Sequence, residues 1–450
     1  MSVPTLPPPP LPRVYIVGGG FAGLAAAKAL SNAPCTVTVV DRRNHHVFQP
    51  LLYQVATASL SPADISAPIR HVLRSQLNCE VVLTEITDID VANKRLTVAT
   101  GSVNYDYLIL AAGATHAYFG HEDWAQFAPG LKSLEDATDI RRRILLAFEA
   151  AEHEGSRDAR RADLTFGIVG AGPTGVELAG DIKDIAGQTI PKEYRHIDTR
   201  STRVILFEGG PRVLPAFRPE LSARALKDLE KMGVEVRLNS LVTNITAQGI
   251  FLGEECIPVR NVFWAAGVKA SPLGALLGVP QDRAGRVIVG KDLAVPGHPE
   301  VFVVGDLAAA RSADTDAAVP GIAQGAIQMG RHAGEIIARE LRGSAHAARP
   351  AFVYRDKGQM AVIGKARAVA QIGRYNVGGF AAWLLWGGVH VLFLVGFRNR
   401  LQVALSWFWN WLLNARDARL IIGDSRLNLR TPRSAQFQAP APERPGGTGR

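Results

Sequence analysis

One stretch near the start of the chain constrains the fold more than any other, Arg13–Arg42, which reads RVYIVGGGFAGLAAAKALSNAPCTVTVVDR. A short apolar run, Val14–Val17, leads into a glycine turn. The glycines of its G-x-G-x-x-G spacing are Gly18, Gly20 and Gly23. A helix of small residues and a second apolar run follow, and Asp41 ends the second run. This order of strand, glycine turn, helix, strand and acid is typical of a βαβ unit that binds a dinucleotide.

The residue types explain why a dinucleotide needs this order. The glycines permit a tight turn and let the backbone approach the pyrophosphate, while the helix N-terminus offers unpaired N–H groups to the phosphates. An acid about 20 positions further on binds the ribose hydroxyls, which is the position of Asp41. A glycine-rich turn in an ordinary α/β unit would leave this acid unexplained. We therefore predict that the loop and Asp41 bind a dinucleotide.

The same pattern recurs in the middle of the chain. Leu164–Val169 is an apolar strand, Val176–Ile185 is helical, and the strand Val204–Phe207 ends at Glu208. The glycines of the second G-x-G-x-x-G are Gly170, Gly172 and Gly175. The distance from this loop to the acid is longer than usual. Because an acid repels a 2′-phosphate, Glu208 favours NADH over NADPH.

A further repeat links the two halves. Tyr105–Gly113 and Asn261–Gly267 both read as buried strands that end in Ala-Ala-Gly. We therefore expect an α/β fold with two Rossmann-like dinucleotide-binding domains and a C-terminal amphipathic helical region. Two dinucleotides that meet can be a tightly held flavin and an exchanging nicotinamide.

Composition limits the partners and the chemistry. A chain of 450 residues is long enough for two or three domains. Its formal charge of +9 suits nucleic acid or an anionic membrane surface, and we see no nucleic-acid module. Cys35, Cys79 and Cys256 are far apart, without a C-x-x-C pair. We expect neither a metal centre nor a redox-active cysteine pair.

The C-terminal part changes character. Tyr375–Phe397 contains no Asp, Glu, Lys or Arg, and by length it could span a bilayer. Leu401–Asn414 carries a polar stripe at spacing four: Gln402, Ser406, Asn410 and Asn414. Five of the seven tryptophans lie in these two segments, and tryptophan favours the membrane interface. We expect residues 375–414 to attach to a lipid surface; a buried dimer interface and a true span are the alternatives.

Four further side chains are candidates with two interpretations each. Glu177, in the first turn of the second glycine-loop helix, either complements the helix dipole or lies where nicotinamide and flavin meet. Asp306 ends the buried strand Val301–Asp306, where it either holds a flavin hydroxyl or caps the next segment. Gln324 and Gln328 share one helix face, either exposed or directed at a carbonyl substrate.

We expect two groups of polar residues to be exposed to solvent rather than functional. His45 and His46, taken singly, read as exposed loop residues, although their segment could run beneath an extended cofactor. Arg141–Arg143 reads as the solvated face of a helix that spans Leu134–Glu154.

Together the motifs resemble one family. About residues 12–423 look like the type II NADH:quinone oxidoreductases, which are single-chain NADH dehydrogenases that do not pump protons. The stretches that carry the resemblance are IVGGGFAGL (Ile16–Leu24), HHVFQPLLYQVA (His45–Ala56), GIVGAGPTGVELAG (Gly167–Gly180), VFVVGD (Val301–Asp306), AQGAIQMG (Ala323–Gly330) and LFLVGFRNR (Leu392–Arg400).

The resemblance implies non-covalent FAD, NADH as substrate and a membrane quinone as acceptor. It implies FAD contacts at Gly18, Gly20, Gly23, Asp41, Gln49, Gly113, Asp306 and Ala323. It implies NADH contacts at Gly170, Gly172, Gly175 and Glu208. It also places Glu177 beside the nicotinamide, with Gln324 and Gln328 lining a quinone tunnel.

The domain organisation follows from the same reasoning. We expect an FAD-binding domain at 13–133 and 290–350, an NADH-binding domain at 134–289, and a membrane-anchoring region at 351–423. The Pro-rich residues 1–12 and the Pro/Gly/Arg-rich residues 424–450 are expected to be disordered tails. We see no targeting segment, which favours the cytoplasmic face of a bacterial inner membrane. Such folds often dimerise, so a homodimer stays open.

Two other functions fit parts of this pattern. One is a related FAD/NAD(P)H reductase that uses another acceptor, for example a sulfide:quinone reductase, a disulfide reductase or a ferredoxin reductase. The thiol-using members need paired cysteines, which are absent here. The other is a flavoprotein sensor that binds NADH but turns over slowly.

Overall fold

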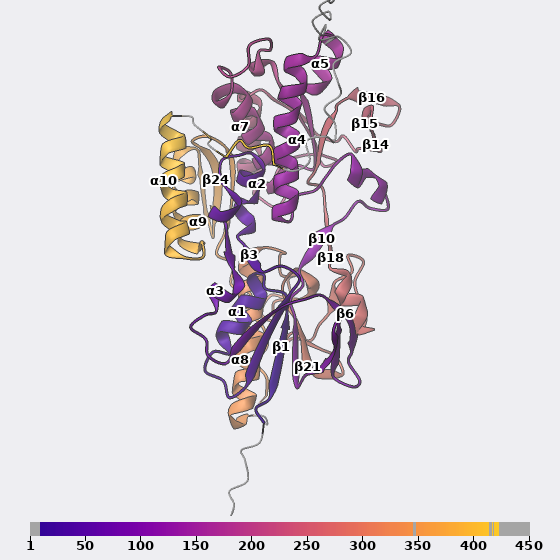
Figure 1. Cartoon of the computed structure of the whole chain (residues 1–450), viewed down its shortest axis with the longest axis vertical. Coiled ribbons are helices and arrows are strands. Elements are labelled where there is room, and N and C mark those ends of the chain that lie inside the picture. Colours follow the sequence, from indigo (N-terminus) through magenta and orange to yellow (C-terminus); the bar gives the residue numbers. More distant parts are fainter. Residues whose placement is uncertain (1–9, 345–347, 414–415, 417, 423–450) are drawn as a thin grey trace, which may run out of the picture.

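The structure is a computed structural model that describes residues 10–344, 348–413, 416 and 418–422. Most of the two predicted tails and the predicted stripe residue Asn414 lie outside the described residues. Two lobes, each built around a parallel sheet, lie one above the other along the long axis, and the C-terminal helices flank one side (Figure 1).

The first lobe is organised around a six-stranded sheet in the order β20-β21-β9-β1-β2-β5. Val14 and Ile16 of the first strand are fully buried, which is the usual environment of a central parallel strand. Strands β1 and β2 pair in parallel, so the predicted N-terminal βαβ unit is confirmed. The strands of this sheet are β1 (Arg13–Val17), β2 (Thr36–Asp41), β5 (Cys79–Leu83), β9 (Tyr107–Leu110), β20 (Ala294–Val295) and β21 (His298–Val303).

Two helices from opposite ends of the chain pack against each other in this lobe. Helix α1 spans Phe21–Ala29 and helix α8 spans Ala323–Arg339. Glycines allow the contact, because a Cβ atom on Gly330 would lie 2.0 Å from the carbonyl oxygen of Ala22. The close packing aligns the beginnings of both helices at the same end of the sheet.

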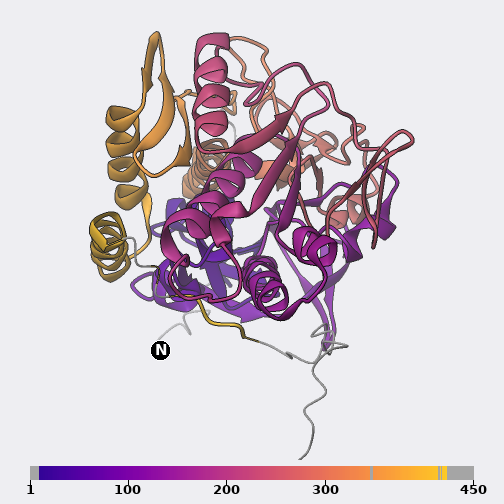
Figure 2. The same ribbon diagram turned by 90° about the horizontal axis from the view of Figure 1, so that it is seen from above.

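The second lobe repeats the arrangement with four parallel strands in the order β13-β12-β11-β17. These strands are β11 (Thr165–Val169), β12 (Arg203–Phe207), β13 (Val234–Arg237) and β17 (Asn261–Trp264). The helices of this lobe are α4 (Leu134–His153), α5 (Arg157–Asp163), α6 (Pro173–Asp184) and α7 (Pro219–Lys231). Figure 2 shows them clustered around the strands.

Small antiparallel sheets complete both lobes. They comprise β3 (His45–Val47) with β4 (Ser66–Pro68), β6 (Ile86–Asp90) with β7 (Arg95–Val98) and β8 (Gly101–Asn104), and β14 (Asn244–Thr246) with β15 (Gly249–Leu252) and β16 (Glu255–Pro258). A further pair is parallel, β19 (Val287–Ile288) with β22 (Ala308–Ala309). Two short helices lie in the first 133 residues, α2 (Leu52–Ala56) and α3 (Ile69–Val72).

The two Ala-Ala-Gly endings lead directly into the junction between the lobes. Strand β10 (Ala114–His116) follows Gly113, and β18 (Val268–Ala270) follows Gly267. These strands pair antiparallel with each other, which connects the lobes (Figure 1). The internal repeat therefore extends to the connection itself.

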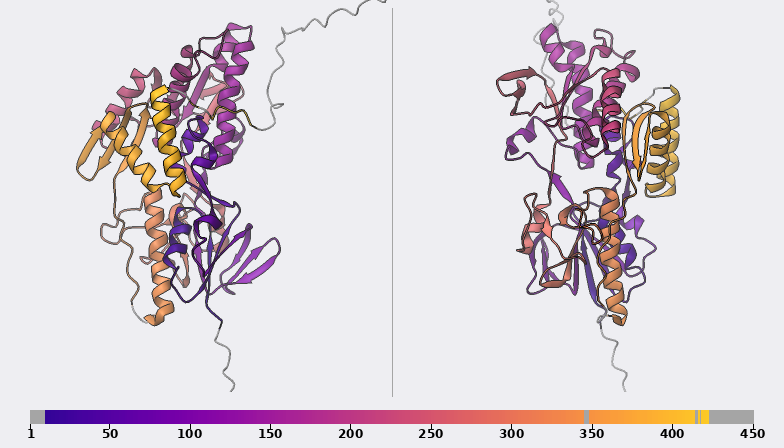
Figure 3. Two further views of the ribbon diagram at one scale, coloured as in Figure 1. Left: turned by 60° about the vertical axis from the view of Figure 1, so that its left-hand side comes forward. Right: turned by 180° about the vertical axis from the view of Figure 1, so that it is seen from behind.

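The C-terminal region begins with a three-stranded antiparallel sheet and ends with two helices (Figure 3). The elements are β23 (Gln359–Gly364), β24 (Arg367–Ile372), β25 (Tyr375–Gly378), α9 (Phe380–Phe393) and α10 (Phe397–Leu413). A strand thus occupies the start of the charge-free segment, and α9 has only 14 residues. Within the described residues, no helix has both the length and the hydropathy to cross a bilayer.

Helix α10 turns its apolar side outward. Seven of its large apolar side chains are between 51% and 80% exposed: Phe397, Leu401, Leu405, Phe408, Trp409, Leu412 and Leu413. Of the polar stripe, Asn410 faces the protein and donates a hydrogen bond of 3.2 Å to the carbonyl of Ser59, whereas Gln402 is exposed. Asn399 does the same for Ser66 at 3.1 Å. Of this helix, Val403 is fully buried.

Candidate functional site

The first glycine loop is shaped to receive a ligand. Gly18 has a φ of +109°, and a Cβ on it would lie 2.4 Å from the carbonyl oxygen of Ala111. A Cβ on Gly23 would lie 1.8 Å from the carbonyl oxygen of Gly18. In contrast, a Cβ on Gly20 would meet nothing within 4 Å. Gly20 caps helix α1, so the open space lies at the helix N-terminus, where phosphates bind.

The second loop matches the first residue by residue. Gly170 has a φ of +100°, Gly175 would place a Cβ 1.9 Å from the carbonyl oxygen of Gly170, and Gly172 faces open space. Gly172 caps helix α6 as Gly20 caps α1. The equivalence gives the protein two sites of the same kind, one in each lobe.

The two acids are also equivalent. Asp41 Oδ2 accepts the backbone N–H of Gly19 at 2.6 Å, and Glu208 Oε2 accepts that of Ala171 at 2.8 Å. Each acid also accepts the N–H two residues beyond itself, at 2.7 Å for Asp41 and 2.8 Å for Glu208. The carboxylates are thereby fixed beside their loops, as ribose recognition requires. The longer insertion before Glu208 leaves this geometry intact.

Other predicted FAD residues surround the first loop. Gly305 packs between Ala22 and Ala326, which brings Asp306 to the beginnings of α1 and α8. The Asp306 carboxylate makes no hydrogen bond or ion pair with any other described residue, so it is free to bind a hydroxyl group. Ala323 is the first residue of α8, and Gly113 has a φ of +67° with open space beside it. Gln49 is exposed and reaches the carbonyl of Lys132 at 3.4 Å.

These features fit FAD. A Cβ atom on Gly20 would fill the open space at the helix N-terminus. Near it, the Asp306 carboxylate has no hydrogen-bond or ion-pair partner among the described residues. The segment that follows β2 borders the loop as well. His46 is 3% exposed, and its Nδ1 lies 3.2 Å from the carbonyl oxygen of Gly19. Since a carbonyl only accepts, Nδ1 carries the proton. The expectation that His46 is exposed is therefore wrong, because the ring holds the glycine loop.

Glu177 lies deeper in its helix than the sequence suggests. Helix α6 begins at Pro173, so Glu177 is in the second turn, and no acid occupies the first turn. The prediction of a first-turn position is wrong, and the dipole interpretation weakens because that effect fades beyond the first turn. Burial and the nearby Asp181 raise the pKa of Glu177 well above its usual value, against a hydrogen bond from the Val362 backbone. A carboxyl group in this setting retains its proton more readily.

Gln324 and Gln328 bind protein backbone. Gln324 donates to the carbonyl of Gly358 at 2.8 Å and accepts from the N–H of Lys357 at 3.0 Å. Gln328 donates to the carbonyl of Arg355 at 3.0 Å and accepts from its N–H at 2.9 Å. Both amides are half-buried rather than fully exposed. They fasten one extended segment, 355–358, onto α8.

That segment connects the candidate residues. It continues into β23, where Val362 contacts Glu177 on α6. A Cβ on Gly180 of α6 would lie 1.7 Å from the carbonyl oxygen of Ile363, so α6 and β23 pack tightly. The chain from 355 to 363 thus joins α8 of one lobe to α6 of the other.

Several polar residues near Glu177 are not predicted by sequence reasoning. Thr57 Oγ1 donates to Asp181 Oδ2 at 2.7 Å, and Arg416 Nη2 lies 3.2 Å from Asp181 Oδ1. The four-residue spacing of Glu177 and Asp181 on one helix is a signal that could have revealed them. Arg141 is buried and donates to the carbonyls of Val55 and Ala418, so for this arginine the solvated-face reading is wrong.

Comparisons with known proteins agree with this architecture. Residues 12–330 match the family described as pyridine nucleotide-disulphide oxidoreductase, and residues 357–417 match the NDH2 C-terminal domain. NDH2 from Plasmodium falciparum, solved in complex with NADH, superposes with a TM-score of 0.83 at 19% identity, covering 92% of this chain and all of that one. The sulfide:quinone oxidoreductase of Aquifex aeolicus superposes with a TM-score of 0.68 at 19% identity, covering 86% of this chain and 92% of that one. Below 25% identity these structures show the fold.

Two relatives in Mycobacterium tuberculosis are much more similar in sequence. The type II NADH:quinone oxidoreductase Ndh is 45% identical over 441 residues, which is 95% of this chain and 94% of that protein. NdhA, of the same description, is 46% identical over 424 residues, with 91% and 89% covered. At this identity and coverage, the chain belongs to the type II NADH:quinone oxidoreductase family.

Proposed function

We propose that this chain transfers a hydride from NADH to non-covalently bound FAD and passes two electrons to a membrane quinone, without pumping protons. The observation that carries the proposal is the pair of equivalent glycine loops, one in each lobe. Glu177 lies beside the segment that joins the two lobes. The M. tuberculosis relatives are named for this reaction, which adds support.

The first loop would hold FAD, and the second would receive NADH. When bound, FAD accepts the hydride and returns electrons one or two at a time to the acceptor. Gly20 and Gly172 leave room for pyrophosphates at two helix N-termini. Asp41 and Glu208 would take the ribose hydroxyls, and the negative charge of Glu208 disfavours the 2′-phosphate of NADPH.

Glu177 would hold a proton at the reacting centre. Its raised pKa favours the protonated form, which can donate to an oxygen that gains electrons. Gln324 and Gln328 would line the approach of the quinone. Since both amides bind the backbone of residues 355–358, their role would be to hold this segment in place as one wall of the quinone approach.

The outward apolar side of α10 would contact the lipid. Leaving seven large apolar side chains in water is unfavourable, and a bilayer surface removes that cost. Arg398 and Arg400 are exposed at the start of the same helix and suit anionic headgroups. A protein attached in this way would meet quinone from the membrane side and NADH from the aqueous side, on the cytoplasmic face of a bacterial inner membrane.

The test is steady-state NADH oxidation by the purified, FAD-loaded protein on lipid vesicles. We expect a short-chain quinone to accelerate the reaction well beyond the rate with oxygen alone. We also expect NADPH to be the poorer substrate. A rate that quinone leaves unchanged, while a soluble disulfide or ferredoxin accelerates it, would replace quinone with another acceptor.

A further inference from the structure

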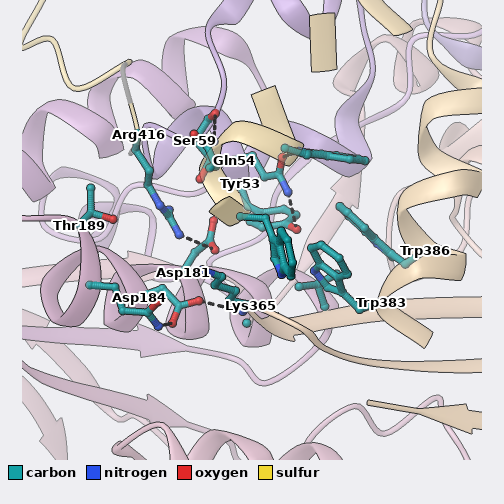
Figure 4. Close-up of a pocket in the computed structure, with 16 residues that line it drawn as sticks. Tyr53, Gln54, Ser59, Asp181, Asp184, Thr189, Lys365, Trp383, Trp386 and Arg416 are labelled. Carbon is teal, nitrogen blue, oxygen red and sulfur yellow. Dashed lines mark hydrogen bonds and ion pairs between the residues drawn. The ribbon is translucent and has the colours of Figure 1, made fainter. Parts of the chain in front are cut away.

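A small cavity lies between α2, α6, β23 and the C-terminal helices (Figure 4). Its volume is about 90 Å³, which leaves room for several water molecules. Its polar wall is formed by Tyr53, Gln54, Asp181, Asp184 and Arg416, and tryptophans of α9 and α10 form the opposite wall. None of these polar residues belongs to the glycine loops, so the cavity is separate from the dinucleotide sites.

A chain of hydrogen bonds fixes the orientation of the Tyr53 hydroxyl. Trp407 donates its indole N–H to Gln54 Oε1 at 2.7 Å, and an indole can only donate. The amide nitrogen of Gln54 must therefore be the group that lies 3.1 Å from the Tyr53 hydroxyl oxygen, to which it donates. Because this oxygen accepts from Gln54, its own proton is left for another acceptor.

The acidic side chains whose charges act on Tyr53 belong to α6. Thr57 donates to Asp181 at 2.7 Å, which sets α2 beside α6. Tyr53 lies one helical turn before Thr57 at the end of α2, as Glu177 lies one turn before Asp181 on α6. Burial, and after it the charges of Glu177 and Asp181, raise the pKa of Tyr53 well above its usual value. The phenol therefore stays protonated around neutral pH, as a proton donor must.

The other charged groups around Tyr53 are already compensated. Asp181 pairs with Arg416, which reaches it from beyond α10. Asp184 accepts from the N–H of Lys365 and from the Gln188 amide, each at 2.9 Å. Glu177 is thus the carboxyl group on this face of α6 that has neither a cation nor a side-chain donor beside it among the described residues.

We propose that Tyr53 relays a proton from water in this cavity to Glu177. The inference rests on the proposed function, in which NADH, one proton and a quinone give NAD⁺ and a quinol. The hydride supplies two electrons and one hydrogen, and water must supply the other. When Glu177 gives its proton to the reduced acceptor, the Tyr53 O–H bond breaks toward Glu177. The phenol oxygen then takes a proton from cavity water, and a proton from the solvent neutralises the hydroxide that remains.

The test compares the two half-reactions of the FAD-loaded protein. In Tyr53→Phe we expect bleaching of the flavin absorbance by NADH to stay within about twofold of wild type, because hydride transfer uses no proton from water. Reoxidation by a short-chain quinone should slow by about tenfold or more, with a larger solvent isotope effect in D₂O. The pH dependence of reoxidation should also move.

Two variants of the cavity wall form a matched pair. Trp407→Phe removes the donor that orients Gln54, and we expect the same effect as Tyr53→Phe in weaker form. Trp411→Phe removes an indole that lines the same cavity without a hydrogen bond to Gln54, and we expect wild-type rates.

Two results would overturn the relay. One is quinone reoxidation in Tyr53→Phe at the wild-type rate and pH profile. The other is equal slowing of both half-reactions, which would mark Tyr53 as a packing residue. Failure of the proposed function is a separate outcome, since wild-type protein would then show no acceleration by quinone.

Discussion

Arg416 forms an ion pair with Asp181 across 235 residues of chain, with 3.2 Å between Nη2 and Oδ1. Both side chains are only 11% exposed. Arg416 also donates to the carbonyl of Thr57 at 3.1 Å. An arginine three residues beyond the end of α10 therefore fastens the C-terminal region to the helix that carries Glu177.

Removing Arg416 should destabilise the protein. Arg416→Ala leaves the Asp181 carboxylate buried without its cation, which costs roughly 3 kcal/mol and lowers Tm by several degrees. Adding Asp181→Asn should recover part of the loss, because the uncompensated charge disappears. Thermal unfolding in detergent measures both. Arg398→Ala, which removes an exposed arginine, is the control and should leave Tm unchanged.

Substitutions in the two glycine loops should have different effects: one should lower the FAD content, and the other should weaken NADH binding. Gly20→Ala places a methyl group in the open space of the first loop, so the purified protein should contain much less FAD. Gly172→Ala does the same in the second loop, and it should raise the KM for NADH roughly tenfold with normal FAD content. Flavin absorbance and initial rates measure the two effects. If Gly172→Ala lost the flavin instead, the assignment of the loops would be reversed.

Glu177→Gln should slow quinone reduction more than hydride transfer. The amide keeps the size of the side chain but cannot release a proton, and a lost general acid costs about a hundredfold. In wild type the rate should fall as pH rises through the raised pKa of Glu177, since the donor form is lost. In the variant that fall should disappear. An unchanged turnover number and pH profile would contradict a proton-transfer role.

The outward side of α10 should control membrane binding. Phe408→Asp replaces a 57% exposed aromatic side chain with a charge, and binding to lipid vesicles should weaken roughly tenfold or more. Gln402→Asp adds the same charge on the same helix without removing apolar area, so it should retain most binding. Co-sedimentation with vesicles gives the comparison. Equal loss in both variants would point to charge rather than apolar contact.

His46 should make stability depend on pH. Burial lowers its pKa from 6.5 to about 4 in the folded protein. Between those values the unfolded chain binds a proton that the folded chain does not, so stability is lost as pH falls from 6.5 toward 4. The loss reaches roughly 3 kcal/mol at the lower end. His46→Asn should reduce this slope in denaturant titrations.

The local patterns were sufficient for the dinucleotide sites. A glycine loop between a β-run and a small-residue helix dictates its own geometry, because only glycine tolerates the φ of +109° at Gly18 and the contact at Gly23. The acids Asp41 and Glu208 follow their strands directly, so their positions beside the loops could be predicted. The resemblance added FAD and the quinone, which no spacing specifies.

Contacts between distant segments escaped the same reasoning. On α10, Asn410 and Trp407 bind backbone and side chains around α2, and the spacing of the polar stripe did not predict these partners. Gln324 and Gln328 suggested a ligand, but their amides meet the backbone of a segment about 30 residues away. Hydrogen-bonding capacity is visible in a sequence, whereas the partner is not.

The sequence by itself determined the two βαβ units, because strand, turn and helix preferences and the acid at the strand end act over a few residues. Only the tertiary structure decided where Glu177 lies relative to Tyr53, Asp181 and Arg416, and which side of α10 faces outward. These relationships depend on how elements separated by hundreds of residues pack, and on which polar groups lose water when they do.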